Sequence, residues 1–169
     1  SSMNKFAIFV DSAANIPNDI RIARDIRVIP FNYIVDGEEH PCFSEDMPFV
    51  ETAKNFYDAM RRGAEAKTSL LSSATFEDAL RPALEEGRDV LLFTISSGVS
   101  GTFAQAQEAG RKLQEEYPDR RIFVLDSANA SLGEGLIAMK VADLRDMGES
   151  AEACAEWVRE NSYKMNSFF

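Results

Sequence analysis

The hydrophobic positions of the chain fall into two kinds of segment, short continuous runs and longer stretches in which apolar residues recur at helical spacing. The continuous runs are rich in β-branched and aromatic residues, which predicts buried strands of a parallel sheet. These predicted strands cover residues 6–10, 26–37, 89–95 and 120–126. The second run is interrupted by Pro30 and closes on an Asp-Gly turn, so it predicts one strand or two.

The amphipathic stretches lie between and after these runs and predict helices. The predicted helices cover residues 48–63, 75–87, 101–118, 133–148 and 150–165, and a shorter helical segment covers 16–25. Thr75 is expected to cap the second helix, and Pro82 inside it is a candidate for a kink. The polar stretches 38–48 and 66–74 are predicted to be loops. Strands that alternate with helices predict an α/β fold, with a parallel-rich central sheet of about four or more strands and helices on both faces.

Length and composition indicate one compact domain over residues 1–169. The 169 residues are 45% hydrophobic and 27% charged, which is ordinary for a globular protein. Residues 1–2 are expected to be a tag remnant before Met3. The formal net charge of −10 disfavours nucleic-acid backbones and anionic membranes, since both attract clustered Lys and Arg. We therefore expect no nucleic-acid partner and no stable membrane insertion.

Cysteine and histidine are too few and too scattered to suggest a metal centre or a disulfide framework. Cys42 and Cys154 lie far apart and are expected to be buried or half-buried thiols, and His40 is the single imidazole. No apolar run approaches the ~20 residues of a membrane span, and no signal peptide is visible. These features predict a cytoplasmic protein without a metal or a cofactor.

Hydroxyl residues gather where the predicted strands end. Ligands of an open parallel sheet bind outside the carboxyl ends of its strands, so these turns are expected to converge on one edge. The residues concerned are Asp11, Ser12, Thr68, Ser69, Ser96, Ser97, Asp126 and Ser127. The two Asp residues could equally serve as turn formers, because Asp bonds to its own following backbone.

The turn 95–102 has the chemistry of an anion cradle. Gly98 and Gly101 permit close backbone approach, and Ser100 or Thr102 can cap the helix that follows. The first amides of that helix carry unpaired N–H groups and a partial positive charge. A second interpretation, a plain connection between strand and helix, stays open. The spacing also does not distinguish a phosphate from a carboxylate.

No serine of the chain has a partner that would make it a nucleophile. A catalytic serine needs a general base, and the only imidazole lies in the loop around His40. The nucleophile elbow, the Walker motif and the dinucleotide-binding motif are all absent from the sequence. We therefore expect no catalytic residue. Two other functions remain open, a kinase-like phosphotransferase that binds phosphate at the Gly/Ser turn, and a purely structural or regulatory domain.

Taken together and in order, these segments resemble the DegV family of bacterial fatty-acid-binding proteins. The matching pieces are FAIFVDSAANIP, IRVIPFNYIVDGEEH, KTSLLSS, ISSGVSGTFAQAQEA and IFVLDSANASLGEGL, which together span nearly all of the chain. The third and fourth are the most specific, since the family pattern there is Thr-Ser-x-Pro-Ser and Ser-Ser-x-x-Ser-Gly-Thr-Tyr/Phe. This sequence departs from the first pattern at Leu71, where Pro is usual, and at Ser73, where a second Pro is common.

The resemblance implies that the chain binds a long-chain fatty acid and presents its carboxylate to a fatty acid kinase, whose product enters phospholipid synthesis. Carried over position by position, it implies head-group contacts from Thr68, Ser69, Ser96 and Ser97. The turn would be shaped by Gly98, Ser100, Gly101 and Thr102, and the same edge would be lined by Asp11, Ser12, Asp126 and Ser127. The 12 Phe residues fit a site for a long apolar ligand as well as a core.

The resemblance also implies a second domain that covers the ligand, and this chain stops after the first. We expect the chain to be the N-terminal domain of a two-domain protein. Without the covering domain, an exposed apolar edge is expected to favour a homodimer of the shortened chain.

Overall fold

The central sheet of the computed structural model is all parallel. The model describes residues 5–11, 16–29, 32–41, 58, 62–63, 66–68, 72–94, 102–126 and 131–166. The sheet has the strand order β2-β1-β6-β7. Its strands are β1 (Ala7–Asp11), β2 (Ile26–Ile29), β6 (Val90–Thr94) and β7 (Ile122–Asp126). The predicted parallel sheet is therefore confirmed.

The two inner strands, β1 and β6, form the middle of the core. Every residue of β6 is buried, as expected for a strand covered on both faces. The pleat sends alternate side chains to opposite faces, so Leu91 and Phe93 enter one apolar cluster while Val90 and Leu92 enter the other. The continuous apolar runs of β1 and β6 therefore contribute side chains to the apolar clusters on both faces of the sheet.

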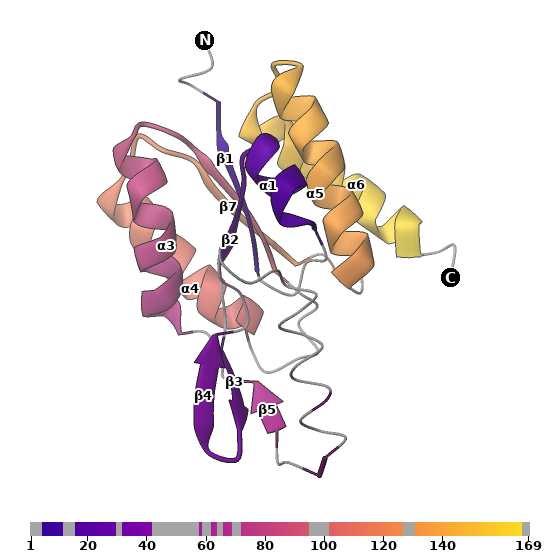
Figure 1. The fold of residues 1–169 in the computed structure, drawn as a ribbon. Coiled ribbons are helices and arrows are strands. Elements are labelled where there is room, and N and C mark those ends of the chain that lie inside the picture. Colours follow the sequence, from indigo (N-terminus) through magenta and orange to yellow (C-terminus); the bar gives the residue numbers. More distant parts are fainter. Residues whose placement is uncertain are drawn as a thin grey trace.

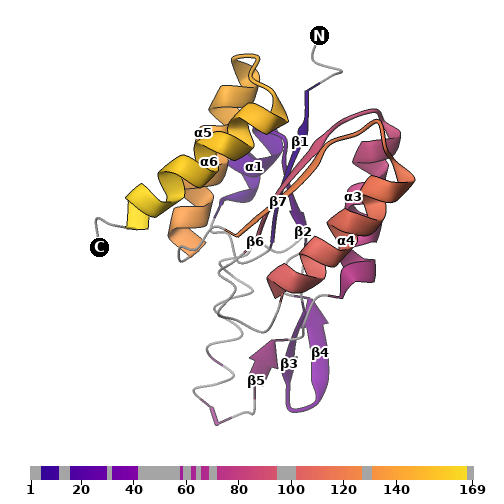
Figure 2. The ribbon, with the colours of Figure 1, turned by 180° about the vertical axis from the view of Figure 1, so that it is seen from behind.

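Helices cover both faces of this sheet (Figures 1 and 2). One face carries α1 (Asn18–Ala23), α5 (Ser131–Asp146) and α6 (Ala151–Asn166). The other face carries α3 (Ser73–Glu85) and α4 (Thr102–Glu116), whose buried side chains pack on β1, β6 and β7. Within the described residues, no helix combines the length and the apolar character needed to cross a membrane.

A small antiparallel sheet lies beyond the carboxyl ends of the central strands (Figure 1). It has the order β4-β3-β5 and consists of β3 (Asn32–Val35), β4 (Glu38–Pro41) and β5 (Ala66–Thr68). The β3–β4 hairpin turns at Asp36 and Gly37, which both have positive φ, 49° and 82°. This geometry confirms the predicted Asp-Gly turn and matches the type I′ turn that two-residue hairpins favour.

The small sheet decides between one strand and two for the run 26–37, and it corrects two other expectations from the sequence. The run 26–37 forms two strands, and they belong to different sheets. The stretches 38–48 and 66–74, predicted as loops, contain β4 and β5. Both strands are short and lack an alternating apolar pattern, and they are defined by their backbone pairing with β3.

The start of α3 corrects a further expectation from the sequence, that Thr75 caps this helix. Ser72, not Thr75, is the N-cap, with extended backbone angles (φ −83°, ψ 161°) and a side chain that accepts from the backbone N–H of Thr75 at 3.3 Å. Pro82 lies inside the helix, which runs unbroken from Ser73 to Glu85. The predicted helix over 48–63 falls almost entirely outside the described residues.

Candidate functional site

The strand order creates a topological switch point between β1 and β6. These two strands are neighbours, with Val10 opposite Phe93. The chain leaves β1 toward α1 on one face of the sheet and leaves β6 toward α4 on the other (Figures 1 and 2). Connections that diverge in this way open a crevice at the carboxyl edge, where α/β proteins bind their ligands. The crevice would lie beyond Asp11 and Thr94.

The structure places four of the predicted site residues by their backbone. Asp11 and Asp126 end β1 and β7 at the carboxyl edge, Thr68 ends β5, and Thr102 is the first residue of α4. The remaining eight lie in the connections outside the described residues, namely Ser12, Ser69, Ser96, Ser97, Gly98, Ser100, Gly101 and Ser127. Asp11 and Asp126 thus stand at the carboxyl ends of two strands of the same sheet, and both the lining of the site and the head-group contacts stay a prediction.

Thr94 is a hydroxyl residue at this edge with a structural role. It is fully buried, and its Oγ1 donates to the carbonyl oxygen of Leu125 on β7 at 3.4 Å. In the register of the sheet it stands opposite Asp126, which is partly buried. Thr94 thus ties β6 to β7 where both strands end, and its hydroxyl is already used inside the protein.

The helices α3 and α4 run side by side and in the same direction, and both begin at the carboxyl edge (Figure 1). At this end the backbone N–H of Ser73 donates to Oε1 of Gln105 at 2.9 Å. At the far end, Tyr117 Oη donates to Glu85 at 3.1 Å. The bond at the near end joins the first residue of α3 to the first turn of α4.

Sequence reasoning missed Gln105. A glutamine one turn into an amphipathic helix carries no signal of its own, because most such residues face solvent. Its partner Ser73 lies 32 positions earlier in the chain. Only the packing of α3 on α4 identifies it.

The electrostatics of the two helix starts favour an anion. Parallel helices place the positive ends of both macrodipoles on the same edge. In the described part of each helix, the first turn holds no acidic residue that would neutralise this field. This is notable in a chain whose formal net charge is −10. Among the described residues, no three His, Cys, Asp or Glu side chains are grouped in a way that could hold a metal ion.

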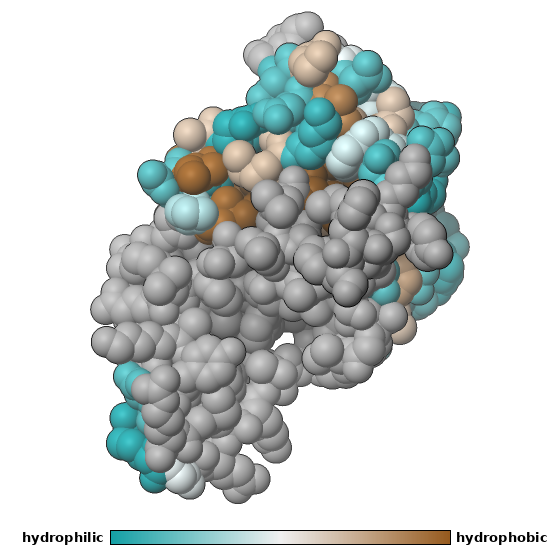
Figure 3. Space-filling model, turned by 90° about the vertical axis from the view of Figure 1, so that its right-hand side faces the viewer, coloured by the Kyte–Doolittle hydropathy of each residue, from teal (hydrophilic) through white to brown (hydrophobic). Residues whose placement is uncertain are grey.

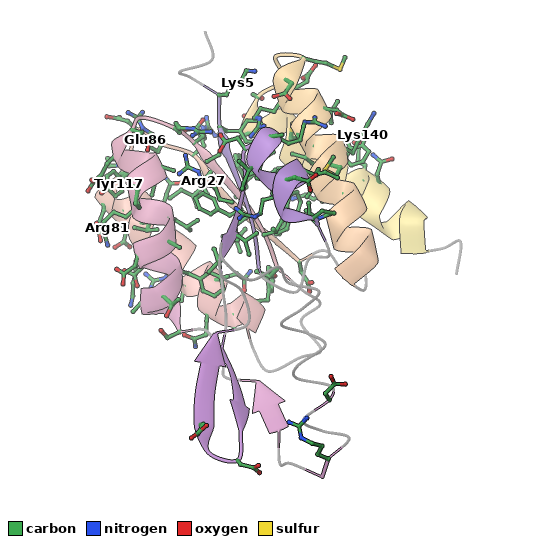
Figure 4. The ribbon with its side chains drawn as sticks, in the orientation of Figure 1. Lys5, Arg27, Arg81, Glu86, Tyr117 and Lys140 are labelled. Carbon is green, nitrogen blue, oxygen red and sulfur yellow. The ribbon has the colours of Figure 1, made fainter. Side chains whose placement is uncertain are left out.

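The opposite, amino edge of the sheet holds a cleft of about 560 Å³ with a different character. Its lining is mostly charged, with Lys5, Ala23, Arg24, Asp25, Glu86, Arg88, Arg145 and Asp146. Figure 4 shows Lys5, Arg27 and Glu86 at this end. Arg27 and Glu86 form an ion pair at 3.7 Å, and Arg88 pairs with Asp25 at 2.9 Å.

This charged cluster joins the ends of several elements. The Arg145 side chain is only 4% exposed and donates to the carbonyl oxygens of Arg24 and Asp25, where α1 ends. Partial burial alone would raise the pKa of Asp25, but the hydrogen bond from Arg88 and the nearby guanidinium charges together hold that pKa below its usual value. The cluster therefore links these elements to one another, because its arginine side chains pair with carboxylates and backbone carbonyls of the same chain.

The outer surface of α5 and α6 is largely hydrophilic over its described residues (Figure 3). The exposed large hydrophobic residues of the described chain are Ile20, Ile22 and Met147. They are few and lie on different elements, α1 and the turn between α5 and α6. The homodimer expected from an exposed apolar edge stays a prediction.

Comparison with known proteins places this geometry in a family. The model of the DegV family, described as uncharacterised proteins, matches residues 5–169. A DegV domain-containing protein of Clostridium perfringens is 32% identical over 167 residues, which cover 99% of this chain and 56% of that protein. The chain therefore spans about half the length of the curated relatives it matches.

Two solved structures share the fold and are described by what they bind. A DegV family protein of Thermus thermophilus, described as binding fatty acid, superposes with a TM-score of 0.80 at 28% identity, covering 94% of this chain and 54% of that one. A DegV lipid-binding protein of Thermotoga maritima gives a TM-score of 0.79 at 30% identity, covering 95% and 55%. With the family model matched from residue 5 to residue 169, the chain belongs to the DegV family.

Proposed function

We propose that this chain forms part of a fatty-acid-binding protein and holds the acyl carboxylate at the carboxyl edge of its central sheet. The observation that carries the proposal is the pairing of two helix starts at this edge through Ser73 and Gln105. The hydroxyl-rich segments lead directly into those helices, so their donors and the positive helix ends would face the same anion. The fatty-acid-binding relative from Thermus thermophilus supports the ligand class.

In this proposal the hydroxyls of Thr68, Ser69, Ser96 and Ser97 donate to the carboxylate. Gly98, Ser100, Gly101 and Thr102 shape the turn that begins α4, and Asp11, Ser12, Asp126 and Ser127 line the edge. A carboxylate held by neutral donors keeps electron density on its oxygens, whereas a bidentate arginine would occupy both of them. The bound acid would thus remain able to react with a phosphoryl donor.

The reaction itself would belong to a partner, a fatty acid kinase that phosphorylates the presented carboxylate in the cytoplasm. The proposal therefore assigns this chain a binding role and no catalytic residue. The kinase partner follows from the family resemblance. The relatives are longer than this chain, and in them the part beyond the match would be able to make further contacts to the ligand.

The test is to extract lipids from the purified 169-residue chain, identify them by mass spectrometry, and titrate the delipidated chain with palmitate. Thr68→Ala and Ser97→Ala are each expected to raise the Kd for palmitate about tenfold, the cost of one hydrogen bond to a charged group. Ser150→Ala is the matched control. The Ser150 hydroxyl accepts from Ala153 N–H at the start of α6 at 3.1 Å, so its loss affects a helix cap at the other edge.

A chain that retains no long-chain acid and binds no added palmitate would overturn the proposal. Calorimetry with ATP tests the competing phosphate-binding function, since a kinase-like domain would bind nucleotide and this protein would not. Unchanged palmitate affinity in both Ala variants would assign these hydroxyls a structural role only.

A further inference from the structure

We propose that Gln105 is a positioning residue for the carboxylate site, because its side chain links the starts of α3 and α4. This inference rests on the proposed fatty-acid-binding function and names a residue that the family pattern does not single out. Gln105 would not touch the ligand. It would act through the backbone amide of Ser73.

The hydrogen bond between Ser73 and Gln105 has a defined direction, and it satisfies a backbone N–H that α3 cannot pair by itself. Ser73 is the first residue of α3, and a helix cannot pair the N–H groups of its own first turn. Ser72 satisfies one of them with its hydroxyl, at 3.3 Å from Thr75 N, and Gln105 satisfies the N–H of Ser73 at 2.9 Å. Because the backbone N–H is a donor, the oxygen of the Gln105 amide must face it. The bond is partly buried, so water would replace the lost acceptor only in part.

The position of this bond explains why it would govern the site and not only the fold. Most of the α3–α4 interface is apolar and lies further along the helices, where Phe76 and Leu80 belong to the same core cluster as Ala109. At the far end the pair is held by Arg81 with Glu116 and by Tyr117 with Glu85. Among the described residues, the Ser73–Gln105 hydrogen bond links the two helices at the near end, and in the sequence a hydroxyl-rich segment precedes each helix. Loosening it would let the two helix starts separate while the rest of the interface stays packed.

The sequence around Ser73 suggests why a glutamine is useful here. Proline is favoured at the first position of a helix, because its fixed φ fits and it has no N–H to satisfy. This chain has Ser73 at that position, and the free N–H is taken up by Gln105. A Ser73→Pro variant should be tolerated, since Ser72 already has the extended backbone (φ −83°, ψ 161°) that a residue before proline requires.

The experiment compares the affinities of the 169-residue chain for palmitate and for methyl palmitate, which has the same acyl chain and no charge. Gln105→Met keeps the length of the side chain and removes the acceptor. It is expected to raise the Kd for palmitate about tenfold and to leave the Kd for methyl palmitate unchanged, because only the head-group donors move. Tyr117→Phe is the matched control, since it removes one hydrogen bond from the other end of the same helix pair. It should change neither affinity.

A second comparison tests the route through Ser73. In a Ser73→Pro background no N–H remains for Gln105 to accept, so Gln105→Met should have no further effect on palmitate binding. Ser73→Ala retains the N–H and should leave the effect of Gln105→Met intact. Should Gln105→Met fail to fold, Gln105→Asn, which is shorter by one methylene, takes its place with the same expected direction.

Three results would overturn the inference. They are an unchanged palmitate Kd in Gln105→Met, an equal loss of affinity for the acid and its ester, and an undiminished effect of Gln105→Met in the Ser73→Pro background. A failure of the proposed function gives a different result, because the wild-type chain would then bind neither palmitate nor its ester, and the positioning role would fall with it.

Discussion

Gly110 in α4 faces the β7 residues Val124 and Ile122, and replacing it tests the packing that holds α4 on the sheet. A Cβ built at this position would stand 2.9 Å from Cγ2 of Val124, closer than carbon atoms normally pack. The next atom it would meet is Cγ2 of Ile122 at 3.7 Å, which is an ordinary contact. A single methyl group of Val124 therefore decides whether alanine fits.

Two opposing terms set the expected magnitude for Gly110→Ala. Alanine in a helix interior is favoured over glycine by about 1 kcal/mol. Overpacking a filled interface by one methyl group costs about 1–3 kcal/mol. The net result is a free energy of unfolding that is unchanged or lower by up to about 2 kcal/mol. In a Val124→Ala background the obstructing atom is absent, so Gly110→Ala should raise the free energy of unfolding by about 1 kcal/mol, the helix-propensity gain alone.

The assay is urea unfolding, followed by circular dichroism, of the wild type, both single variants and the double variant. The coupling free energy of the cycle should favour the double variant by about 1–3 kcal/mol, because the two substitutions share one contact. Strictly additive effects, or a Gly110→Ala variant that is more stable than the wild type, would refute the reasoning. Gln107→Ala, on the exposed side of the same helix, controls for changes in propensity alone.

Two further predictions concern ionisable groups. The pKa of Asp25 is held below its usual value in the folded chain, so its contribution to stability is present above the unfolded pKa of about 4 and is lost as the pH falls through the folded value. Asp25→Asn should therefore lower the urea midpoint at pH 7 and lower it by less as the pH falls below about 4, and an equal loss at pH 7 and in acid would contradict the linkage. Burial, with a smaller contribution from the charge of Glu149, raises the pKa of the Cys154 thiol to about 11. In a Cys42→Ser variant the remaining thiol should resist a thiol reagent at pH 8 and react promptly in urea, and rapid labelling of the folded chain would show that Cys154 is accessible.

Much of the architecture was predictable because it depends on local pattern. Continuous apolar runs such as 89–95 can be buried only in the middle of a covered sheet, and β6 is buried along its whole length. The pair Asp36-Gly37 is suited to positive φ at both positions, which predicts the hairpin turn without any other contact. The amphipathic stretches predicted the main helices to within a few residues, because one apolar stripe is enough to dock a helix on the sheet.

The errors share a physical cause. The short strands β4 and β5 contain few apolar residues, and they exist because β3 offers a backbone partner on each side. The cap of α3 was assigned to Thr75 from a local pattern, yet the helix starts earlier, where Gln105 of a distant segment can take up the N–H of Ser73. For β5 and for Ser73 the stabilising partner lies many residues away, so no short window of sequence contains it. The partner of β4 is the adjacent strand β3, but the polar sequence of β4 gives no strand signal of its own.

For the candidate site, the sequence by itself determined which residue types are present and where they stand relative to strand ends, namely hydroxyls and glycines without a base or a metal-binding group. Only the tertiary structure decided how these segments meet. The order β2-β1-β6-β7 sends α1 and α4 to opposite faces, and the parallel packing of α3 on α4 brings two helix starts to one edge. The physical reason is that strand order and helix direction are set by contacts between distant segments, whereas the side-chain type at each position is given by the sequence itself.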